Sequence, residues 1–477
     1  MDVKSRMDVG LMRLFDNLRE LGDAPALIDE QGAVLTYGDL ADHVTSISSE
    51  VKKRSLVFCF CTNTVESITG YVALTSAGHV CLMLSNSLGA EKVDSLITTF
   101  RPNLLWCPAD SDNVPELPVI AGVGAYQLRL NSRVSLDMHP DLSVLMSTSG
   151  STGSPLMVRQ SRLNLAANAT SIVESLSLSA QDRALTTLPM NYTYGLSIVN
   201  SQLHCGGSLV VTEATLMDRR FWDLVGSSGA TYFGGVPYTY EMLNRIGVKK
   251  LKDTSLRMLT QAGGRLKPEL VESMHDQCSA LGIEFVVMYG QTEATARMSV
   301  LQCGDIPGHS ASIGKPVPGG AFRVVDLDED IEVPTGETGE LEFSGPNVTM
   351  GYASGETDLS RGDERGGALR TGDLARVDDD GFFYIVGRRK RFVKLFGHRT
   401  NLDDVEHHLS SLGYEVACTG SDDRLQVNVV GDVDEQKLLD ATAAFVSTNK
   451  KAITVKRLKV IPRSDAGKVL YSAIETD

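Results

Sequence analysis

Short apolar runs rich in β-branched residues alternate with amphipathic stretches along most of this 477-residue chain, and this alternation restricts the fold more than any other feature. The run SLVFCF precedes VESITGYVALTSA, and GSLVVTE precedes RRFWDLVGSSG and then ATYFGGV. Strands that alternate with helical segments form β/α units, in which helices cover a largely parallel sheet. The alternation therefore predicts an α/β fold.

The pattern changes from Phe322 onward to closely spaced strands with Gly and Pro turns, as in FRVVD, GETGELEFSG and GFFYIVG. This spacing is typical of a small β-rich subdomain. After the basic run RRKRFVK, the chain from LDDVEHHLSSL to VKRLKVIPRSDAGKVL has the pattern of a compact α+β unit. We therefore predict two domains, residues 1–388 and 389–477, with a hinge near Lys390.

Composition restricts the class of protein further. Apolar residues make up 42% of the chain and charged residues 22%, as in ordinary globular enzymes. The formal net charge of -15 argues against a nucleic-acid partner. The eight cysteines include no CxxC pair, and no apolar run reaches the roughly 18 residues of a membrane span, so we expect a cytoplasmic protein with reduced cysteines. Within LVFCFC, Cys59 and Cys61 are expected to pack on one face of a strand.

A loop rich in Ser, Thr and Gly follows an apolar strand in VLMSTSGSTGSPLMV, residues 144–158. Glycines allow backbone N–H groups to turn inward and hydroxyl groups add donors, so such a loop can surround a polyphosphate. It lacks the GK[ST] ending of a Walker A loop, and a flexible turn explains it as well when it is taken alone. Its members are Thr148, Ser149, Gly150, Ser151, Thr152 and Gly153.

A second polar turn ends the strand in FVVMYGQTEATARM, residues 285–298. Glu293 offers hard oxygen ligands for Mg²⁺, Thr292 offers a donor for a phosphate, and Tyr289 offers a ring on which a base can stack. Taken alone, Glu293 is explained equally well as a carboxylate at a helix N-terminus.

Three further segments each have a functional and a structural interpretation. In LTQAGGRL, the small residues 262–264 leave room for a flat ligand or form a tight turn. In LRTGDLARVDDDGFFYIVGRRKR, Asp373 can accept from two ribose hydroxyls and Arg388 can reach a phosphate, or both belong to exposed ion pairs. In VIPRSDAGKVLYSAI, Lys468 is a candidate only in combination with the other segments, because a lone lysine is usually a solvated surface charge.

In this order and spacing, the five segments resemble the adenylate-forming superfamily of acyl-CoA synthetases, peptide-synthetase adenylation domains and beetle luciferases. The resemblance covers nearly the whole chain and includes ALIDEQGAVLTYGDLADHV, LPMNYTYGLS, SIGKPVPGG, GELEFSGPNVTMGY and KLFGHRTNLDDVE. It implies a large N-terminal domain of two doubly wound α/β halves with a small β-subdomain, followed by a small mobile α+β lid. The implied activity is the ATP-dependent conversion of a carboxylic acid to an acyl-adenylate with release of pyrophosphate.

The resemblance also implies residue roles. Lys468, on the lid, would bridge the acid's carboxylate and the α-phosphate, and Thr292 would hold that phosphate. Glu293 would hold Mg²⁺, which together with Lys468 reduces the repulsion between the carboxylate and the triphosphate. Asp373 would bind the ribose, and Arg388 the ribose or a phosphate. The remaining nucleotide contacts would be the loop from Thr148 to Gly153, and Ala262, Gly263, Gly264, Tyr289, Gly290 and Gln291.

The chain departs from the family pattern in three places. Where the loop usually continues PKG, this chain has Pro155, Leu156 and Met157, so a lysine expected near the pyrophosphate is missing. Either Arg159 replaces it, or the loop relies on hydroxyl groups and Mg²⁺. Where many members have a histidine in LPxxHxxG, this chain has Tyr192. The lid is also shorter than usual, which leaves its acceptor surface undefined.

The acid itself is restricted by the fourth motif, where peptide-synthetase domains commonly place an aspartate to pair with the substrate's ammonium group. Asn191 and Tyr192 occupy that region, and because neither is acidic we disfavour an ordinary α-amino acid. We expect an aryl or a short to medium acyl acid. The expected pocket residues are Tyr192, Tyr194, Gly235, Val236, Pro237, Gly263 and Met288.

The acceptor of the acyl group stays open among a CoA thiol, a carrier-protein thiol and an amine. A thiol is favoured, because thioester formation is the commonest outcome in the families that this chain resembles and the start of the lid is basic. An amide synthetase, in which an amine attacks the adenylate, is the main alternative. A non-catalytic nucleotide-binding regulator is another; Leu156 supports it, whereas the retention of Glu293, Asp373, Arg388 and Lys468 opposes it.

Overall fold

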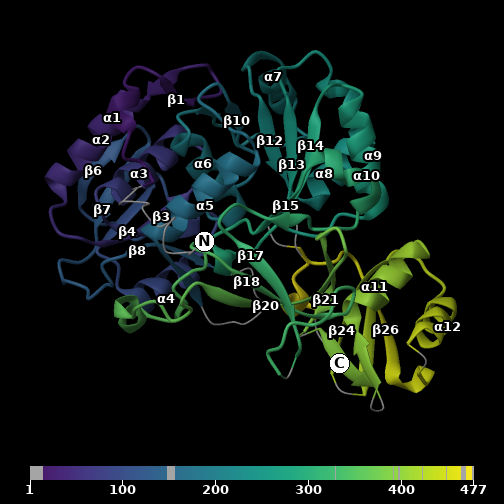
Figure 1. Cartoon of the computed structure of the whole chain (residues 1–477). Coiled ribbons are helices and arrows are strands. Elements are labelled where there is room, and N and C mark those ends of the chain that lie inside the picture. The colour runs from purple at the N-terminus through teal and green to yellow at the C-terminus, as the bar shows by residue number, and fades with distance from the viewer. Residues whose placement is uncertain are drawn as a thin grey trace. The chain divides into compact units, whose positions relative to one another are not determined.

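The computed structural model describes residues 14–147, 156–327, 329–389, 391–395, 398–421, 423–446, 448–463 and 469–474 (Figure 1). The described residues form two compact units. The first comprises those before 148, those from 156 to 321 and those from 344 to 369, and the second comprises those from 322 to 343 and those from 370 onward. The β-rich segment therefore groups with the C-terminal residues. The predicted hinge residue, Lys390, lies outside the described residues and stays a prediction.

One sheet of the first unit has the order β16-β15-β14-β13-β12-β10-β11-β1-β2. Its central pairs, from β14 through β1, are parallel, whereas its outer pairs are antiparallel. Parallel pairing of apolar strands is what the alternating sequence pattern predicts. The strands are β1 (Pro25–Ile28), β2 (Val34–Thr36), β10 (Arg183–Leu185), β11 (Ser208–Val210), β12 (Tyr232–Gly235), β13 (Met258–Gln261), β14 (Glu284–Tyr289), β15 (Ser299–Leu301) and β16 (Lys315–Pro316).

The other large sheet of the first unit has the order β19-β9-β8-β4-β3-β5-β7-β6. Its centre, from β8 through β5, is again parallel. The strands are β3 (Leu56–Cys61), β4 (Val80–Ser85), β5 (Leu104–Pro108), β6 (Val119–Val123), β7 (Tyr126–Leu130), β8 (Leu142–Ser147), β9 (Met157–Ser161) and β19 (Tyr352–Ala353). Two parallel-centred sheets confirm the predicted pair of α/β halves.

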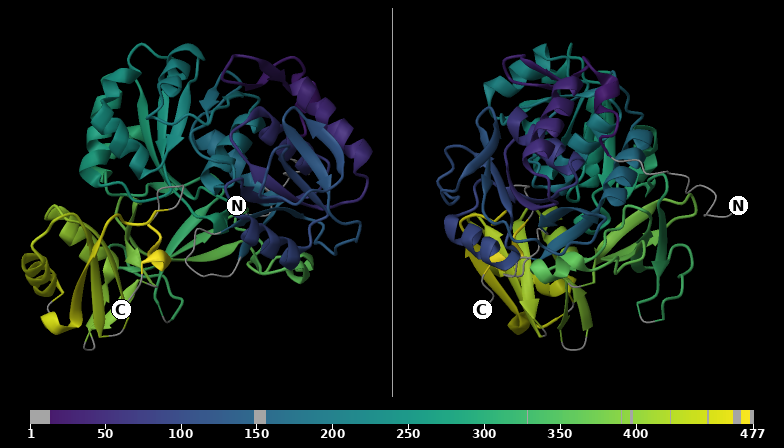
Figure 2. Two further views of the ribbon diagram at one scale, coloured as in Figure 1. Left: turned by 180° about the vertical axis from the view of Figure 1, so that it is seen from behind. Right: turned by 90° about the vertical axis from the view of Figure 1, so that its left-hand side faces the viewer.

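Helices α5 (Arg162–Ser175) and α6 (Thr193–His204) lie between the two sheets, while α8 (Pro237–Ile246) and α9 (Pro268–Ser279) cover the outer face of the sheet containing β12 to β14 (Figures 1 and 2). Apolar residues of α5, α6 and the inner faces of both sheets form one buried cluster. Helix α5 begins at a capping box, in which Ser161 and Asn164 satisfy each other's backbone N–H groups. The remaining described helices of this unit are α1 (Leu18–Leu21), α2 (Tyr37–Glu50), α3 (Val65–Ser76), α4 (Ala90–Phe100), α7 (Arg219–Ser227) and α10 (Ile306–His309).

Strand β3 shows how the alternation of side chains builds two cores. Cys59 and Cys61 belong to the cluster between the sheets, which confirms their predicted packing on one face. Phe58 and Phe60 point to the opposite face and pack in a second cluster, together with Val93 of α4.

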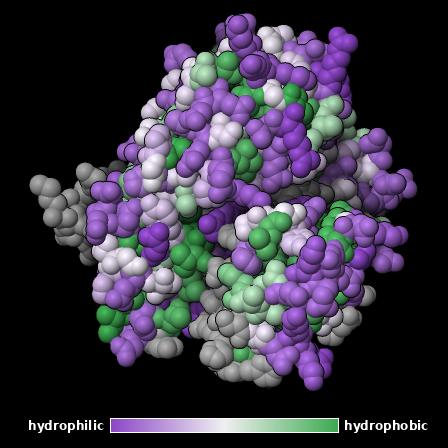
Figure 3. All heavy atoms as spheres, turned by 90° about the vertical axis from the view of Figure 1, so that its right-hand side faces the viewer, coloured by the Kyte–Doolittle hydropathy of each residue, from purple (hydrophilic) through white to green (hydrophobic). Residues whose placement is uncertain are grey.

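The outer surface over α8 and α9 is mainly hydrophilic, as Figure 3 shows. None of the described helices is long and apolar enough to span a membrane.

A buried arginine joins β9 to the segment that ends the first unit. Arg159 has no exposed side-chain area, and its guanidinium donates to the carbonyl oxygens of Met350 at 2.9 Å and Tyr352 at 3.1 Å. It also donates to the carbonyl oxygens of Arg361 and Gly362 and to the Glu364 carboxylate, the last at 2.6 Å. Each of the three guanidinium nitrogens therefore donates to a protein acceptor, and residues 350–364 are fixed against the sheet.

We expect Arg159→Met to lower the free energy of unfolding by about 3–5 kcal/mol, because it leaves buried carbonyl oxygens without a donor. Glu364→Gln, which keeps an acceptor on a half-exposed side chain, should cost about 1 kcal/mol or less. Urea unfolding of both variants measures the difference. Equal losses in the two variants would contradict a structural role for the carbonyl contacts.

His79 is buried as a neutral side chain at the start of β4. Its Nδ1 accepts a hydrogen bond from the Ser55 N–H at 3.2 Å, and its Nε2 has no partner among the described residues. Burial, and to a smaller extent the charge of Arg54, lowers the pKa of His79 to about 4. The unfolded chain therefore takes up a proton between about pH 6.5 and 4 that the folded chain does not.

This difference predicts that His79 makes the protein less stable as the pH falls from 6.5 towards 4, by up to about 3 kcal/mol. The measurement is the free energy of unfolding against pH for the wild type and for His79→Gln, which keeps an acceptor for Ser55. The stability of the wild type should fall relative to the variant across this window. Parallel pH curves for the two proteins would show that His79 titrates normally.

The second unit contains the predicted β-rich segment and an α+β part. Its first sheet has the order β17-β18-β20-β21, formed by β17 (Ala321–Val325), β18 (Gly339–Ser344), β20 (Ala368–Val377) and β21 (Phe383–Arg388). The α+β part buries two apolar clusters of its own among the described residues. Its elements are β22 (Phe392–Leu395), β23 (His398–Asn401), α11 (Leu402–Ser411), β24 (Glu415–Ser421), β25 (Arg424–Val430), α12 (Glu435–Phe445) and β26 (Ile453–Leu458).

A network around Arg391 holds the chain that follows the predicted hinge. Its guanidinium donates to Glu406 at 2.6 Å, lies 2.6 Å from Asp403, and stacks 3.7 Å from the ring centre of Tyr471. Glu406 also accepts from the Cys418 N–H at 2.6 Å and from the Tyr471 hydroxyl at 3.0 Å. Arg391 is therefore bound to α11 and to the C-terminal residues of the second unit.

Candidate active site

Three neighbouring parallel strands of the first unit end at the same edge of their sheet. Gly235 of β12 pairs with Gln261 of β13, and Gln261 pairs with Val287 of β14. The segments at the ends of these strands, 236–237, 262–264 and 289–293, therefore lie at the same edge of the sheet. The crevice at the carboxyl ends of parallel strands is where α/β folds bind ligands. The register thus brings together three segments that the sequence analysis selected separately.

Close backbone approaches explain two of the glycines at this edge. Gly263 has a φ of +85°, and a Cβ on it would lie 2.2 Å from the hydroxyl oxygen of Tyr192. A Cβ on Gly290 would lie 1.7 Å from the carbonyl oxygen of Ala296, so the turn after β14 closes on itself only with glycine. The Gln261 amide donates to the Gly264 carbonyl at 2.9 Å and closes the neighbouring turn. Both predicted turns are therefore compact.

Glu293 lies in the short 3-10 turn Thr292–Ala294 that follows β14. Its Oε1 accepts from the Tyr352 hydroxyl at 2.8 Å, and its carbonyl accepts from the Thr349 N–H at 3.0 Å and from Arg365 at 3.0 Å. Burial, together with the nearby Glu293 carboxylate, raises the pKa of Tyr352 to about 12, so this hydroxyl stays a donor near neutral pH. The carboxylate is half-buried and oriented from one side.

This arrangement fits a Mg²⁺ ion that arrives with a triphosphate. No group of three or more His, Cys, Asp or Glu side chains in the described part of the chain is placed to hold a metal ion. Mg²⁺ is commonly bound through one or two carboxylates together with phosphate oxygens and water, rather than by a complete protein cage. Glu293, with one oxygen oriented by Tyr352, provides a single carboxylate of this kind.

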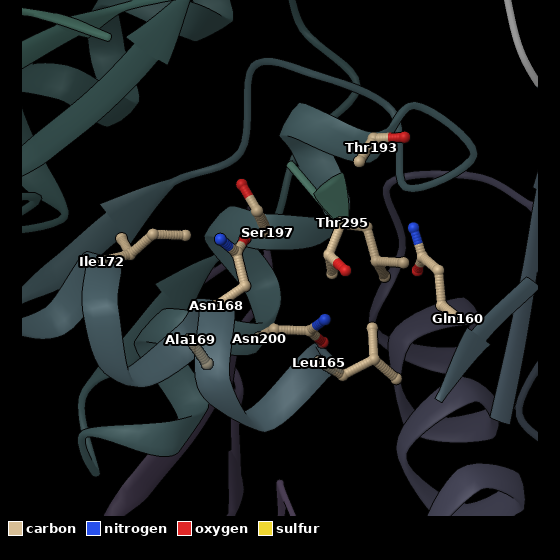
Figure 4. A pocket seen from close by; sticks show the side chains of 10 residues that line it. Gln160, Leu165, Asn168, Ala169, Ile172, Thr193, Ser197, Asn200 and Thr295 are labelled. Carbon is tan, nitrogen blue, oxygen red and sulfur yellow. The ribbon is translucent and has the colours of Figure 1, made fainter. Parts of the chain in front are cut away.

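Thr292 is oriented by the first residue of α6. The Thr193 hydroxyl donates to the Thr292 hydroxyl oxygen at 3.0 Å. Behind Thr193 is a cavity of about 10 Å³, which is roughly the room that one water molecule needs. Figure 4 shows Gln160 on one side of it and Asn168 on the other. The Gln160 amide is buried without a partner among the described residues, so this cavity suits one ordered water.

The expected acid-pocket residues of the first unit lie close together. The rings of Tyr192 and Tyr194 meet edge to face with centroids 6.4 Å apart, and the Tyr194 hydroxyl bonds to Thr260 at 2.8 Å. Val236 caps α8 and Pro237 is its first residue, which places both directly after β12. The Met288 sulfur accepts from a guanidinium N–H of Arg297 at 3.2 Å. Arg297 is a residue that the sequence analysis did not select.

In the second unit, the structure pairs the two predicted ribose and phosphate ligands. Asp373 and Arg388 are register partners on β20 and β21, and Arg388 Nε donates to Asp373 Oδ1 at 3.0 Å. The Asp373 side chain is 9% exposed, whereas that of Arg388 is 65% exposed. The arginine therefore orients the buried carboxylate. Their contacts with a nucleotide stay a prediction.

Several predicted site residues lie outside the described residues. These are the loop from Thr148 to Gly153, the bridging Lys468 and the hinge residue Lys390. The first alternative, that Arg159 replaces the missing loop lysine, is wrong, because this side chain is fully buried and each of its guanidinium nitrogens already donates to residues 350–364 inside the first unit. A loop that relies on hydroxyl groups and Mg²⁺ remains as the alternative.

The sequence analysis also missed residues that support the site. Thr193, Tyr352 and Arg297 contact selected residues and stand in segments that the sequence analysis named, yet none of them was given a role. Tyr352 ends the segment GELEFSGPNVTMGY, but its partner Glu293 is distant in the sequence, so the segment by itself does not reveal their contact. Arg297 stands in FVVMYGQTEATARM, where a charged residue among small and apolar neighbours was the signal available.

Comparison with known proteins agrees with the geometry of the candidate site. The fold and the strand-end turns define a nucleotide-binding α/β enzyme. The family model described as "AMP-binding enzyme" matches residues 14–353, and the chain therefore belongs to the AMP-binding enzyme family.

Relatives in this family include acid–CoA ligases and parts of longer synthases. The indoleacetate–CoA ligase of Aromatoleum aromaticum is 26% identical over 429 residues, covering 84% of this chain and 81% of that protein. The phenyloxazoline synthase MbtB of Mycobacterium sp. (strain MCS) is 28% identical over 457 residues, covering 91% of this chain and 37% of that protein.

A solved structure shows the shared fold over almost the full length. It is o-succinylbenzoate coenzyme A synthetase (MenE) from Bacillus subtilis in complex with ATP and a magnesium ion, with a TM-score of 0.76 and 21% identity. The match covers 96% of this chain and 98% of that chain.

The turn after β14 provides a test of the candidate site. We expect Gly290→Ala to weaken ATP binding at least about tenfold, because a methyl group 1.7 Å from a backbone oxygen forces the turn and Glu293 to move. Gly304→Ala is the matched control, since its Cβ would meet nothing within 4 Å. Calorimetric titration with ATP and Mg²⁺ measures both variants. Unchanged affinity in Gly290→Ala would show that this turn does not contact the nucleotide.

Proposed function

We propose that this protein is an acid–thiol ligase that converts a carboxylic acid and ATP to an acyl-adenylate and pyrophosphate, and then transfers the acyl group to the thiol of CoA or of a carrier protein. The observation that carries the proposal is the alignment of the segments after β12, β13 and β14 at one sheet edge, with Thr292 and Glu293 at its end. Membership of the AMP-binding enzyme family supports the adenylation step.

The proposed chemistry follows from charges and donors. In this proposal the adenine ring lies against the compact turns at 262–264 and 289–290, and Thr292, oriented by Thr193, donates to the α-phosphate. Glu293 holds the Mg²⁺, which when bound neutralises charge on the phosphates during attack by the carboxylate. Asp373, oriented by Arg388, accepts from the ribose hydroxyls. Lys468 places a second cation between the carboxylate and the α-phosphate.

The thiol acceptor is proposed over an amine because the curated relatives include CoA ligases, such as the indoleacetate–CoA ligase described above. The same relative makes an aryl-bearing acid a reasonable first class of substrate. The anchoring of Arg391 to Glu406 and Tyr471 supports rotation of residues after Lys390 as a rigid body, since the residue after the hinge is bound to other residues of the lid.

The test is acid-dependent release of pyrophosphate from ATP, measured across aryl, fatty and amino acids, each without acceptor, with CoA and with simple amines. Acceleration by CoA would establish the thiol acceptor, whereas acceleration by amines alone would make the protein an amide synthetase. ATP binding without release for any acid would support the non-catalytic alternative.

Lys468→Ala tests the bridging cation in the same assay. We expect a loss of pyrophosphate release of at least about 100-fold with nearly unchanged ATP affinity, because the lysine acts mainly on the developing charge of the transition state. Lys459→Ala, an exposed lysine elsewhere in the lid, is the control and should release pyrophosphate at the wild-type rate. Equal rates for both variants would remove Lys468 from the mechanism.

A further inference from the structure

Arg297 is a buried cation without a counter-charge among the described residues. Its residue exposure is 2%, and its Nε and Nη2 atoms have no hydrogen-bond partner among the described residues. The contacts of its head are a hydrogen bond from Nη1 to the Met288 sulfur at 3.2 Å and a cation–π contact, in which the guanidinium carbon lies 4.8 Å from the centre of the Tyr194 ring. A thioether is a weak acceptor, so both contacts are weak for a buried charge.

The surroundings of this guanidinium contain phenols rather than carboxylates. Among the described residues, the groups whose charge interacts with Arg297 are Tyr194, Tyr232 and Tyr240. Burial raises the pKa of all three phenols, so they are neutral at ordinary pH and supply no negative charge. A buried charge is costly unless it is paired and hydrogen-bonded. The described residues of the folded protein do not pair the charge of Arg297 in this way.

Arg159 shows what a structural buried arginine looks like in the same unit. It is equally buried, but its guanidinium donates to four backbone carbonyls and one carboxylate. Arg297 has two N–H-bearing nitrogens directed at none of the described acceptors. The contrast indicates that the partner of Arg297 is a group that the described residues do not contain.

The place of Arg297 indicates where such a group comes from. Its two contacts, Tyr194 and Met288, are both residues of the expected acid pocket. Tyr192 is half-buried and lies against Gly263, Tyr194 is buried beside it, and the guanidinium follows Tyr194. Tyr194 therefore contacts both the partly exposed Tyr192 and the buried Arg297. Met288 is unbranched and adaptable, so it is the contact that an entering ligand can displace.

We propose that Arg297 recognises a second carboxylate at the far end of the acid substrate, so that the preferred substrate class is a dicarboxylic acid. This inference rests on the proposed adenylation function and specifies its substrate. One carboxylate reacts with ATP, and the other accepts two parallel hydrogen bonds from the planar guanidinium, a geometry that arginine provides and lysine does not. The distal carboxylate and Arg297 then neutralise each other within an apolar and aromatic enclosure.

The experiment compares acids in which a terminal methyl or ring hydrogen is replaced by a carboxylate. The pairs are butyrate with succinate, hexanoate with adipate, and benzoate with isophthalate, each assayed for ATP-dependent pyrophosphate release by the wild type, Arg297→Met, Arg297→Lys and Arg245→Met. Arg245 is an exposed arginine of α8, so its variant removes one positive charge without changing the pocket.

For the best pair, the wild type should prefer the dicarboxylate by at least about 100-fold in kcat/KM, because a monocarboxylate leaves the guanidinium unpaired. Arg297→Met should reverse this preference, Arg297→Lys should keep part of it, and Arg245→Met should keep all of it. Equal kcat/KM values for both members of every pair in the wild type would overturn the inference while leaving the adenylation function intact. A preference that survives in Arg297→Met would also overturn it.

A binding measurement separates this inference from the proposed function. Without ATP, dicarboxylates should raise the Tm of the wild type and of Arg245→Met but not of Arg297→Met, and without any acid Arg297→Met should have a higher Tm than the wild type, since it removes a buried unpaired charge. These shifts without pyrophosphate release would contradict adenylation and support the site. A lower Tm for a folded Arg297→Met, with equal shifts by dicarboxylates in both proteins, would show that Arg297 is structural.

Discussion

The in-register parallel pairing of β12, β13 and β14 is the constraint on which the candidate site depends. Gly235, Gln261 and Val287 are aligned across the three strands by backbone hydrogen bonds. A shift of one residue would turn every side chain of a strand to the other face, so the buried faces keep this register. Because the strands run to the same edge of the sheet, three loops far apart in the sequence start near one another. The turn with Thr292 and Glu293 can contribute to the candidate site only when the other two loops lie beside it.

The loops at this edge are then held by contacts from other parts of the first unit. Thr193 at the start of α6 orients Thr292, and Tyr352 and Arg365 orient the turn that contains Glu293. Arg159 fixes the segment that supplies Tyr352 by binding its carbonyl oxygens. The side chains proposed to carry the chemistry are thus positioned by residues without a proposed chemical role, which is the usual way in which a rigid site is supported.

The two buried arginines of this unit show how the same residue type takes two roles. Arg159 has a full set of acceptors and stabilises the fold, whereas Arg297 lacks them and is explained by a ligand. Natural proteins tolerate such a local cost where it contributes to function. A carboxylic acid with a second carboxylate is the proposed ligand that offsets the cost of burying the Arg297 charge. The same interaction limits which acids an otherwise aromatic pocket accepts.

The amino-acid sequence alone determined the α/β class, the β-rich segment after Phe322 and the segments that resemble a nucleotide site, because strand and turn patterns are local and the motifs are contiguous. It did not distinguish the environments of Arg159 and Arg297, and it offered Arg159 as one of two alternatives for the missing loop lysine. Only the tertiary structure decided that question. The burial and the partners of a side chain depend on residues distant in the chain, such as Glu364 for Arg159 and Tyr194 for Arg297, and no local pattern records them.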